Sequence, residues 1–229
     1  MQFSKIKSYA KLNLSLHVIK KIPKKLHIIE SLITFVNFYD AIYIREIQAL
    51  EHKLKFLGDF SKNITQKNTV NNLLNLLDEK KLLKDKKFEI KIIKNIPQKS
   101  GMGGGSMNAS SIIKFFLKKK VINLSKKNLN NIMKTIGSDV PLGMNLKNTI
   151  LSKTGKLTVK EKKLGLYTLI VKPNFGCSTK IIYSKTKEQT KPKYDNPKVS
   201  FFSINNIINS NNDLEKAAFK LNPKLKNLK

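Results

Sequence analysis

Apolar and polar residues alternate strictly along residues 10–18. The apolar positions are Ala10, Leu12, Leu14, Leu16 and Val18. Alternation with a period of two is typical of a strand that buries one face. Lys11 and Asn13 share the other face, about 7 Å apart at the usual strand rise.

Two later segments carry apolar residues at helical spacing. Their stripes consist of Val70, Leu73, Leu74 and Leu77, and of Leu129, Ile132, Met133 and Ile136. Asn68 and Ser125 are placed to cap these helices at the start, and Gly137 is placed to end the second. A third helix with an apolar face is predicted from about Ser106 to Lys118, directly after a glycine-rich loop.

Short apolar runs predict further strands over residues 32–38, 41–47, 88–94, 149–152, 156–159 and 168–172. A turn is expected near Asp40, between the first two runs. A helix is expected from about Ser178, and the polar stretch 185–198 reads as an exposed loop because it contains Pro192 and Pro197. The change of pattern after Pro141 leaves room for a second lobe from about residue 150.

The chain is strongly basic. Its 229 residues include 45 Lys and Arg against 15 Asp and Glu, which gives a formal net charge of +30. Such a charge attracts polyanions, either nucleic acid or phosphorylated metabolites. The alternative is a compositional bias spread over solvated surfaces, and the scattered positions of the lysines favour it.

Composition also bounds the class of protein. A hydrophobic fraction of 40 % suits a folded globular chain. Cys177 is the single cysteine and cannot form an internal disulfide, so a reducing, cytoplasmic setting is expected. The N-terminus lacks the apolar core of a signal peptide, and no apolar run reaches the roughly 20 residues that a membrane span needs. We therefore expect a soluble protein without membrane partners.

The glycine-rich segment between the strand at 88–94 and the following helix is the most informative part of the chain. Gly101, Gly103, Gly104 and Gly105 lie between Pro97 and Ala109. Without side chains, a backbone can approach an anion closely, and the N-terminus of the next helix adds partial positive charge. The order strand, glycine loop, helix predicts a phosphate-binding loop. A merely flexible turn is the alternative, and the segment matches neither the Walker P-loop nor the dinucleotide fingerprint.

Three polar side chains have both a structural and a chemical interpretation. Ser106 could cap the helix or offer its hydroxyl to a phosphate or to Mg²⁺. Asp139, in the run Gly-Ser-Asp-Val-Pro, could cap a short helix or act as a general base for a phosphoryl acceptor. Lys11 could be a surface lysine whose stem packs on the sheet, or it could stabilise charge beside Asp139.

The segments 10–18, 97–109 and 137–141 occur in the order and at about the spacing found in GHMP kinases. The opening Ala-Lys-x-Asn-x-x-Leu pattern and the Ser-Asp-Val-Pro run are similar to the branch whose acceptor is 4-diphosphocytidyl-2-C-methyl-D-erythritol (CDP-methylerythritol). This resemblance covers nearly the whole chain. It implies a phosphotransferase of the non-mevalonate isoprenoid pathway that phosphorylates the 2-hydroxyl of that acceptor, with ATP and Mg²⁺ as cofactors.

The resemblance also implies roles for individual residues. Asp139 matches the catalytic base and Lys11 its partner. The ATP phosphate loop matches Gly101, Met102, Gly103, Gly104, Gly105 and Ser106. Asn68 and Lys94 match positions on the adenine side. The acceptor site matches Asn13, His27, Thr179 and Tyr183, and a core position is the alternative for Tyr183.

A two-lobed α+β fold is implied as well, with an ATP-binding lobe over 1–150 whose fold type occurs in a ribosomal protein domain. Residues 151–229 would form part of the second lobe, because the third glycine-rich motif of the family would follow Lys229. We therefore expect a truncated form, as a monomer or homodimer. Leu26 stands where the family usually has tyrosine, which removes an aromatic partner for cytosine.

Two other functions stay open. A basic nucleic-acid-binding module would explain the charge, but the chain lacks tryptophan, and basic and aromatic residues are not interleaved along it. A GHMP kinase for a different alcohol is the nearer alternative. We expect a small-molecule substrate and no nucleic-acid partner.

Overall fold

The computed structural model describes residues 2–22, 27–161, 164–186 and 189–228. The alternating segment belongs to a longer strand, β1 (Ser4–Lys20). The two strands expected at 32–38 and 41–47 form one continuous strand, β2 (Ile28–Ile47), so the predicted turn near Asp40 is wrong. Asp40 is fully buried inside β2, because its carboxylate accepts hydrogen bonds from the backbone N–H groups of Asn95 and Ile96, each at 2.8 Å.

The contacts within the chain divide it into two compact units. The first unit comprises residues 1–11, 36–98 and 102–145, and the second comprises residues 12–35, 99–101 and 146–229. Long strands such as β1 and β2 contribute to both units.

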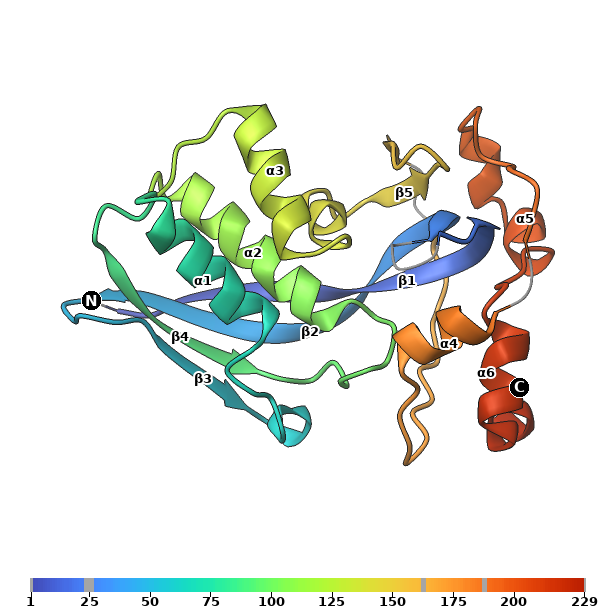
Figure 1. Ribbon diagram of the computed structural model, residues 1–229, viewed down its shortest axis with the longest axis horizontal. Coiled ribbons are helices and arrows are strands. Elements are labelled where there is room, and N and C mark those ends of the chain that lie inside the picture. The colour runs from blue at the N-terminus through green and yellow to red at the C-terminus, as the bar shows by residue number, and fades with distance from the viewer. Residues whose placement is uncertain (1, 23–26, 162–163, 187–188, 229) are drawn as a thin grey trace. The chain divides into compact units, whose positions relative to one another are not determined.

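In the first unit, β2 pairs antiparallel with β4 (Lys87–Ile93) over Ala41–Ile47. Strand β4 also pairs in parallel with β3 (Lys53–Leu57), and β1 pairs with β2. The sequence pattern predicted β4 and missed β3. Figure 1 shows that the helices α1, α2 and α3 of this unit cover one face of the sheet.

These three helices, α1 (Thr69–Glu79), α2 (Gly104–Lys118) and α3 (Lys126–Ile136), confirm the predicted stripes. The side chain oxygens of Asn68 and Ser125 cap α1 and α3 as expected, and Gly137 ends α3. The apolar stripes pack against the sheet in one core that includes Ile42, Ile44, Leu73, Leu77, Ile90, Ile92, Ile112 and Phe116. The short 3-10 helices of this unit are η1 (Asp59–Ser61) and η2 (Val140–Met144).

In the second unit, β2 pairs antiparallel with β5 (Asn148–Leu151) over Ser31–Ile33, and β5 pairs antiparallel with β6 (Leu157–Lys160). The strands expected at 149–152 and 156–159 are thus confirmed. The strand expected at 168–172 is wrong, because no strand hydrogen bonds form there among the residues that the structure describes. Leu169 in that segment is 88 % exposed.

Helices complete the second unit. Helix α4 (Thr179–Lys185) begins after Ser178, as predicted. The remaining helical segments are α5 (Ile204–Ile208), α6 (Glu215–Leu221), η3 (Val199–Phe202) and η4 (Pro223–Leu228). The sequence pattern did not predict any of these four.

The loop at 185–198 is only partly exposed, because Tyr194 is buried. Its hydroxyl lies 2.8 Å from Ser15 Oγ, and its backbone N–H donates to Glu30 Oε2 at 3.1 Å. Glu30, itself fully buried, also accepts a hydrogen bond from Lys193 N–H. These partners, which are distant in sequence, bring a polar loop into the core of the second unit.

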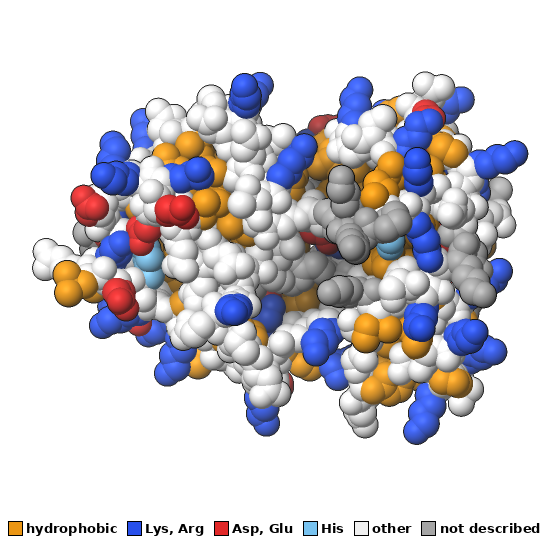
Figure 2. Space-filling view, in the orientation of Figure 1, with side chains coloured by type: hydrophobic (Ala, Val, Ile, Leu, Met, Phe, Trp, Pro, Cys, Tyr) orange, Lys and Arg blue, Asp and Glu red, His pale blue; other side chains and the backbone are white. Residues whose placement is uncertain are grey.

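The helices of the described ranges include none that is long and apolar enough to cross a membrane. Lysine and arginine side chains are scattered over the face that Figure 2 shows and do not form one dense patch. On this face, the scattered positions agree with the interpretation of the charge as a compositional bias.

Candidate active site

The glycine loop leads from β4 into α2, as the sequence predicted. Helix α2 begins at Gly104, and its N-cap is Gly103 in the left-handed conformation, with φ +68°. Ser106 therefore lies in the first turn, and its interpretation as the N-cap is wrong. The first helical hydrogen bond runs from Met107 N–H to Gly103 O, at 2.8 Å. The N–H groups of Gly104, Gly105 and Ser106 precede that bond and remain available to an anion at the helix N-terminus.

Glycine is favoured at Gly103 by its positive φ, and at Gly104 and Gly105 by close neighbours. A Cβ atom on Gly103 would lie 3.4 Å from Lys11 Cε. One on Gly104 would lie 3.2 Å from Lys94 Nζ, and one on Gly105 would lie 2.9 Å from Thr69 Oγ1. The loop is therefore packed against specific side chains, and it is not merely a flexible turn.

Lys11 and Asp139 form an ion pair at this loop. Lys11 Nζ lies 3.2 Å from Asp139 Oδ2, and the Lys11 side chain is only 6 % exposed. The interpretation of Lys11 as a solvated surface lysine is therefore wrong. Asp139 precedes η2 but makes no capping hydrogen bond with its side chain, and 36 % of that side chain is exposed. The carboxylate is thus held by the ammonium group and open to a further hydrogen-bond partner.

Lys11 also joins the carboxylate to the glycine loop. Its backbone N–H donates to Met102 O at 3.1 Å, and its side chain passes Gly103. A second connection runs through Ser106, whose Oγ would lie 3.5 Å from a Cβ atom on Gly137. The structure therefore brings the loop and Asp139 together within the first unit.

Lys94 has a partner that the sequence did not reveal. Its ammonium group pairs with the carboxylate of Asp40, and both side chains are buried. Asn108 Nδ2 donates to the same carboxylate at 3.0 Å. Asp40 therefore connects the end of β4 with the second turn of α2, on either side of the glycine loop. The only signal in the sequence was a carboxylate within an apolar run, which we interpreted as a turn.

Asn68 is engaged mainly as a cap. Its Oδ1 accepts hydrogen bonds from Val70 N–H and Asn71 N–H, each at 3.0 Å. The next residue, Thr69, contacts Gly105, so the N-terminus of α1 adjoins the glycine loop. Contacts of Asn68 and Lys94 with adenine stay predictions.

The residues expected at the acceptor lie in the second unit. Asn13 Oδ1 accepts a hydrogen bond from Ser31 Oγ at 3.1 Å. The rings of His27 and Tyr183 lie 5.5 Å apart between centroids, at an angle of 46°. Thr179 is exposed at the start of α4. Their roles stay predictions.

Gly101 and Leu26 are the remaining positions singled out by the sequence. Gly101 belongs to the second unit and has φ +74°, and a Cβ atom there would meet no atom within 4 Å. Its assignment to the phosphate loop stays a prediction. Leu26, which stands in place of the family tyrosine, lies outside the described residues.

Replacing Gly105 by alanine is expected to lower kcat/KM for ATP about ten-fold, since overpacking costs about 1–3 kcal/mol and 1.4 kcal/mol is a factor of ten. The new methyl group would meet Thr69 Oγ1 and move the first turn of α2. Steady-state kinetics with varied ATP would measure the change.

The double variant Gly105→Ala, Thr69→Ala removes the contacting hydroxyl and should recover most of the loss. If the double variant is as impaired as the single one, this contact does not explain the need for glycine.

Residues 68–147 match the family model described as the GHMP kinases N terminal domain. The matched range contains α1, the glycine loop and Asp139, which are the elements that the structure brings together. Fold and site thus define the class as GHMP kinase.

Named relatives of the chain identify one family within this class. A 4-diphosphocytidyl-2-C-methyl-D-erythritol kinase from Pelagibacter ubique is 50 % identical over 229 residues, which is 100 % of this chain and 81 % of the relative. A protein of the same name from Anaplasma marginale is 30 % identical over 229 residues, covering 97 % of this chain and 78 % of the relative. The chain belongs to the 4-diphosphocytidyl-2-C-methyl-D-erythritol kinase family.

Solved structures agree on the fold. A crystal structure of 4-(cytidine 5'-diphospho)-2C-methyl-D-erythritol kinase matches with a TM-score of 0.70 at 20 % identity, over 98 % of this chain and 81 % of that chain. Homoserine kinase from Cytophaga hutchinsonii matches with a TM-score of 0.52 at 16 % identity, over 83 % and 62 % of the two chains. The expected α+β fold of the GHMP kinases is confirmed.

Proposed function

We propose that this chain transfers the γ-phosphoryl group of ATP to the 2-hydroxyl of 4-diphosphocytidyl-2-C-methyl-D-erythritol, a step of the non-mevalonate isoprenoid pathway. The observation that carries the proposal is the placement of Lys11, which contacts both the glycine loop and Asp139. A phosphate bound at the loop would lie beside a carboxylate that can take a proton. Membership of the kinase family supports the same reaction.

The first turn of α2 supplies the phosphate site in this proposal. The N–H groups of Gly104, Gly105 and Ser106 would donate to phosphate oxygens, with the helix dipole adding positive potential. The ammonium group of Lys11 would stabilise negative charge on the transferring group, because it is buried and already oriented.

Asp139 is the proposed general base. It would accept the proton of the acceptor hydroxyl as the oxygen–phosphorus bond forms and the bond between the γ-phosphorus and the bridging oxygen of ADP breaks. The exposed part of its carboxylate leaves room for that hydroxyl. Catalysis then consists of positioning two ligands and accepting one proton.

Mg²⁺ would accompany the nucleotide. Within the described part of the chain, His, Cys, Asp and Glu form no group of three or more that could hold a metal ion. This fits an ion bound mainly through the phosphates, to which the Ser106 hydroxyl could contribute a ligand. The ion would neutralise phosphate charge.

The acceptor would be recognised by residues of the second unit. We assign the cytidine to Thr179 and Tyr183, since an aromatic ring can stack on a base, and the remainder of the acceptor to Asn13 and His27. The tilted contact between His27 and Tyr183 supports this assignment, because it presents two rings side by side at one location.

The test is phosphoryl transfer by the purified chain with ATP, Mg²⁺ and CDP-methylerythritol. We expect one ADP for each phosphorylated acceptor, measured by ³¹P NMR. The comparison acceptors are homoserine and 2-C-methyl-D-erythritol 4-phosphate, which lack cytidine. Preference for either of these two acceptors would overturn the assignment of CDP-methylerythritol as the acceptor. Unchanged phosphoryl transfer by Asp139 variants would overturn the assignment of Asp139 as the general base.

A further inference from the structure

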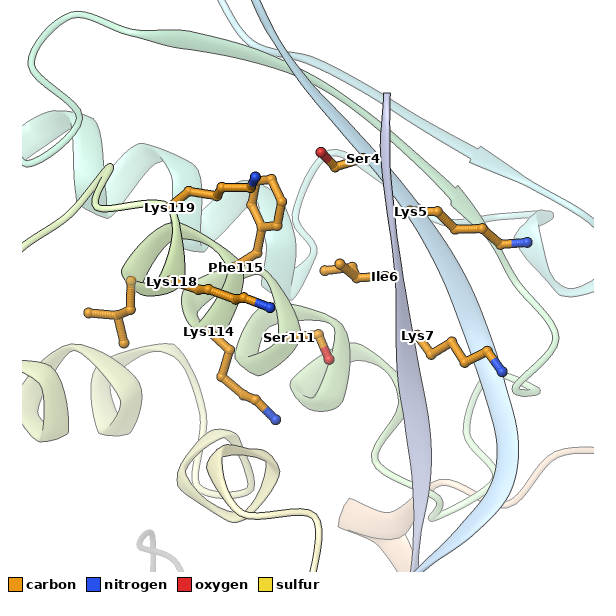
Figure 3. A pocket seen from close by; sticks show the side chains of 10 residues that line it. Ser4, Lys5, Ile6, Lys7, Ser111, Lys114, Phe115, Lys118 and Lys119 are labelled. Carbon is orange, nitrogen blue, oxygen red and sulfur yellow. The ribbon is translucent and has the colours of Figure 1, made fainter. Parts of the chain in front are cut away.

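A groove runs between the start of β1 and helix α2 in the first unit, and its lining includes none of the proposed active-site residues (Figure 3). It has a volume of about 570 Å³. It is lined by Ser4, Lys5, Ile6 and Lys7 of β1 and by Ser111, Lys114, Phe115, Leu117, Lys118 and Lys119 of α2. A strand and a helix thus form its two walls.

The strand wall is a free sheet edge. Strand β1 pairs with β2, and the described residues place no other strand along the outer edge of β1 over Ser4–Lys7. Unpaired N–H and C=O groups on such an edge are a template for one more strand. Figure 3 shows Ser4 and Ile6 directed toward α2, whereas Lys5 and Lys7 are directed to the opposite side.

The floor of the groove is apolar and its surroundings are basic. Ile6 and Phe115 supply apolar surface between the walls. The lining includes five lysines and no carboxylate. Burial lowers the pKa of Lys114, and no carboxylate opposes that effect. A ligand that brings negative charge to Lys114 would therefore compensate an ammonium group that has lost part of its hydration.

Lysines on an edge strand commonly protect it from aggregation. They do so by repelling neutral or basic strands, including the same edge of a second copy of this chain, which carries the same lysines. They do not repel an acidic strand, since opposite charges on neighbouring strands attract. Nucleic acid would satisfy the charges but could not use the free backbone ladder or the apolar floor.

We propose that this groove binds an extended, acidic segment of a partner protein, which adds to β1 as a further strand. Alternate side chains of that segment would be apolar and face Ile6 and Phe115, and the intervening ones would be carboxylates beside Lys5 and Lys7. The proposal concerns a surface separate from the kinase site, so it does not depend on the proposed reaction.

The test uses labelled peptides of about eight residues, a usual strand length. A peptide of alternating valine and glutamate is compared with one of alternating proline and glutamate, which has the same charge but lacks the N–H group at every second residue and is disfavoured as a strand. At physiological salt we expect the valine peptide to bind at least about ten-fold more tightly, since each backbone hydrogen bond contributes about 0.5–1.5 kcal/mol. Equal binding of the two peptides would overturn strand addition.

Matched variants locate the binding. Lys7→Gln with Lys114→Gln takes one charge from each wall, and we expect about five-fold weaker binding of the valine peptide. Lys126→Gln with Lys127→Gln removes the same charge from exposed positions at the start of α3 and should change binding less than about two-fold. If the two double variants weaken binding equally, the peptide does not bind in the groove.

Hydrogen exchange adds a readout of the ladder itself. Those amides of residues 4–7 that face the outer edge of β1 should become protected when the valine peptide is added. Protection elsewhere only, or tighter and groove-dependent binding of a polyuridine RNA, would overturn the proposal in favour of a different site or of a nucleic-acid partner.

Discussion

Replacing Asp139 by asparagine is expected to lower kcat about 10²–10⁴-fold, the usual contribution of general acid–base catalysis. The amide keeps the shape of the side chain but cannot accept the proton of the acceptor hydroxyl. KM for ATP should change less than kcat, because the proposed donors to the phosphates are backbone N–H groups of α2. Steady-state turnover with a coupled ADP assay measures both quantities.

Asp59→Asn provides the control for this prediction. It makes the same chemical change at an exposed position, and we expect wild-type turnover. Thermal melting of both variants establishes that the fold is intact. Near-normal turnover of the Asp139 variant would remove that residue from the mechanism.

Replacing Asp40 by asparagine is expected to destabilise the first unit by about 3–5 kcal/mol, the cost of leaving a buried charge without its partner. The partner is Lys94, whose side chain is only 5 % exposed. Urea unfolding followed by circular dichroism measures the loss. Because Asp40 also holds Asn108 of α2, surviving activity should show a raised KM for ATP.

The double variant Asp40→Asn, Lys94→Met tests whether the loss of stability comes from the unpaired charge of Lys94 or from the changed side chain at position 40. Removing both charges should recover much of the stability, since replacement of a whole buried pair is often neutral. Glu46→Gln, which breaks a more exposed pair with Lys86, should cost less than about 1 kcal/mol. If the double variant is no more stable than Asp40→Asn, loss of the ion pair is not the cause.

Much of the candidate site could be predicted locally. The strand containing Lys11, the glycine loop and the segment around Asp139 each carry a short-range pattern, and the structure brings them together in the first unit. Asn68 was recognised as a cap because a helix N-terminus needs an oxygen acceptor at that position. The apolar stripe of α1 is buried as its period predicted, and the stripe of α3 is buried at Ile132 and Met133 and partly buried at Leu129 and Ile136.

Several side chains were interpreted wrongly, or left with two interpretations, because their partners are distant in sequence. Asp40 looked like a turn residue, but hydrogen bonds from residues 94–96 and 108 keep it inside β2. For Lys11 the sequence left a surface lysine and a partner of Asp139 as alternatives, and its burial beside Asp139 excludes the first. Tyr194 lies in a polar stretch and is buried by contacts with Ser15 and Glu30.

The segment 168–172 differs from these side chains, because here the prediction required a distant partner that the described residues do not provide. Its pattern predicts a strand, but among the described residues it has no strand to pair with, and Leu169 stays exposed.

The sequence by itself determined the periods, caps and glycines, because these depend on backbone sterics and on hydrogen bonds between near neighbours. Only the tertiary structure decided which polar groups are buried and which strands pair, because both require partners from other parts of the chain.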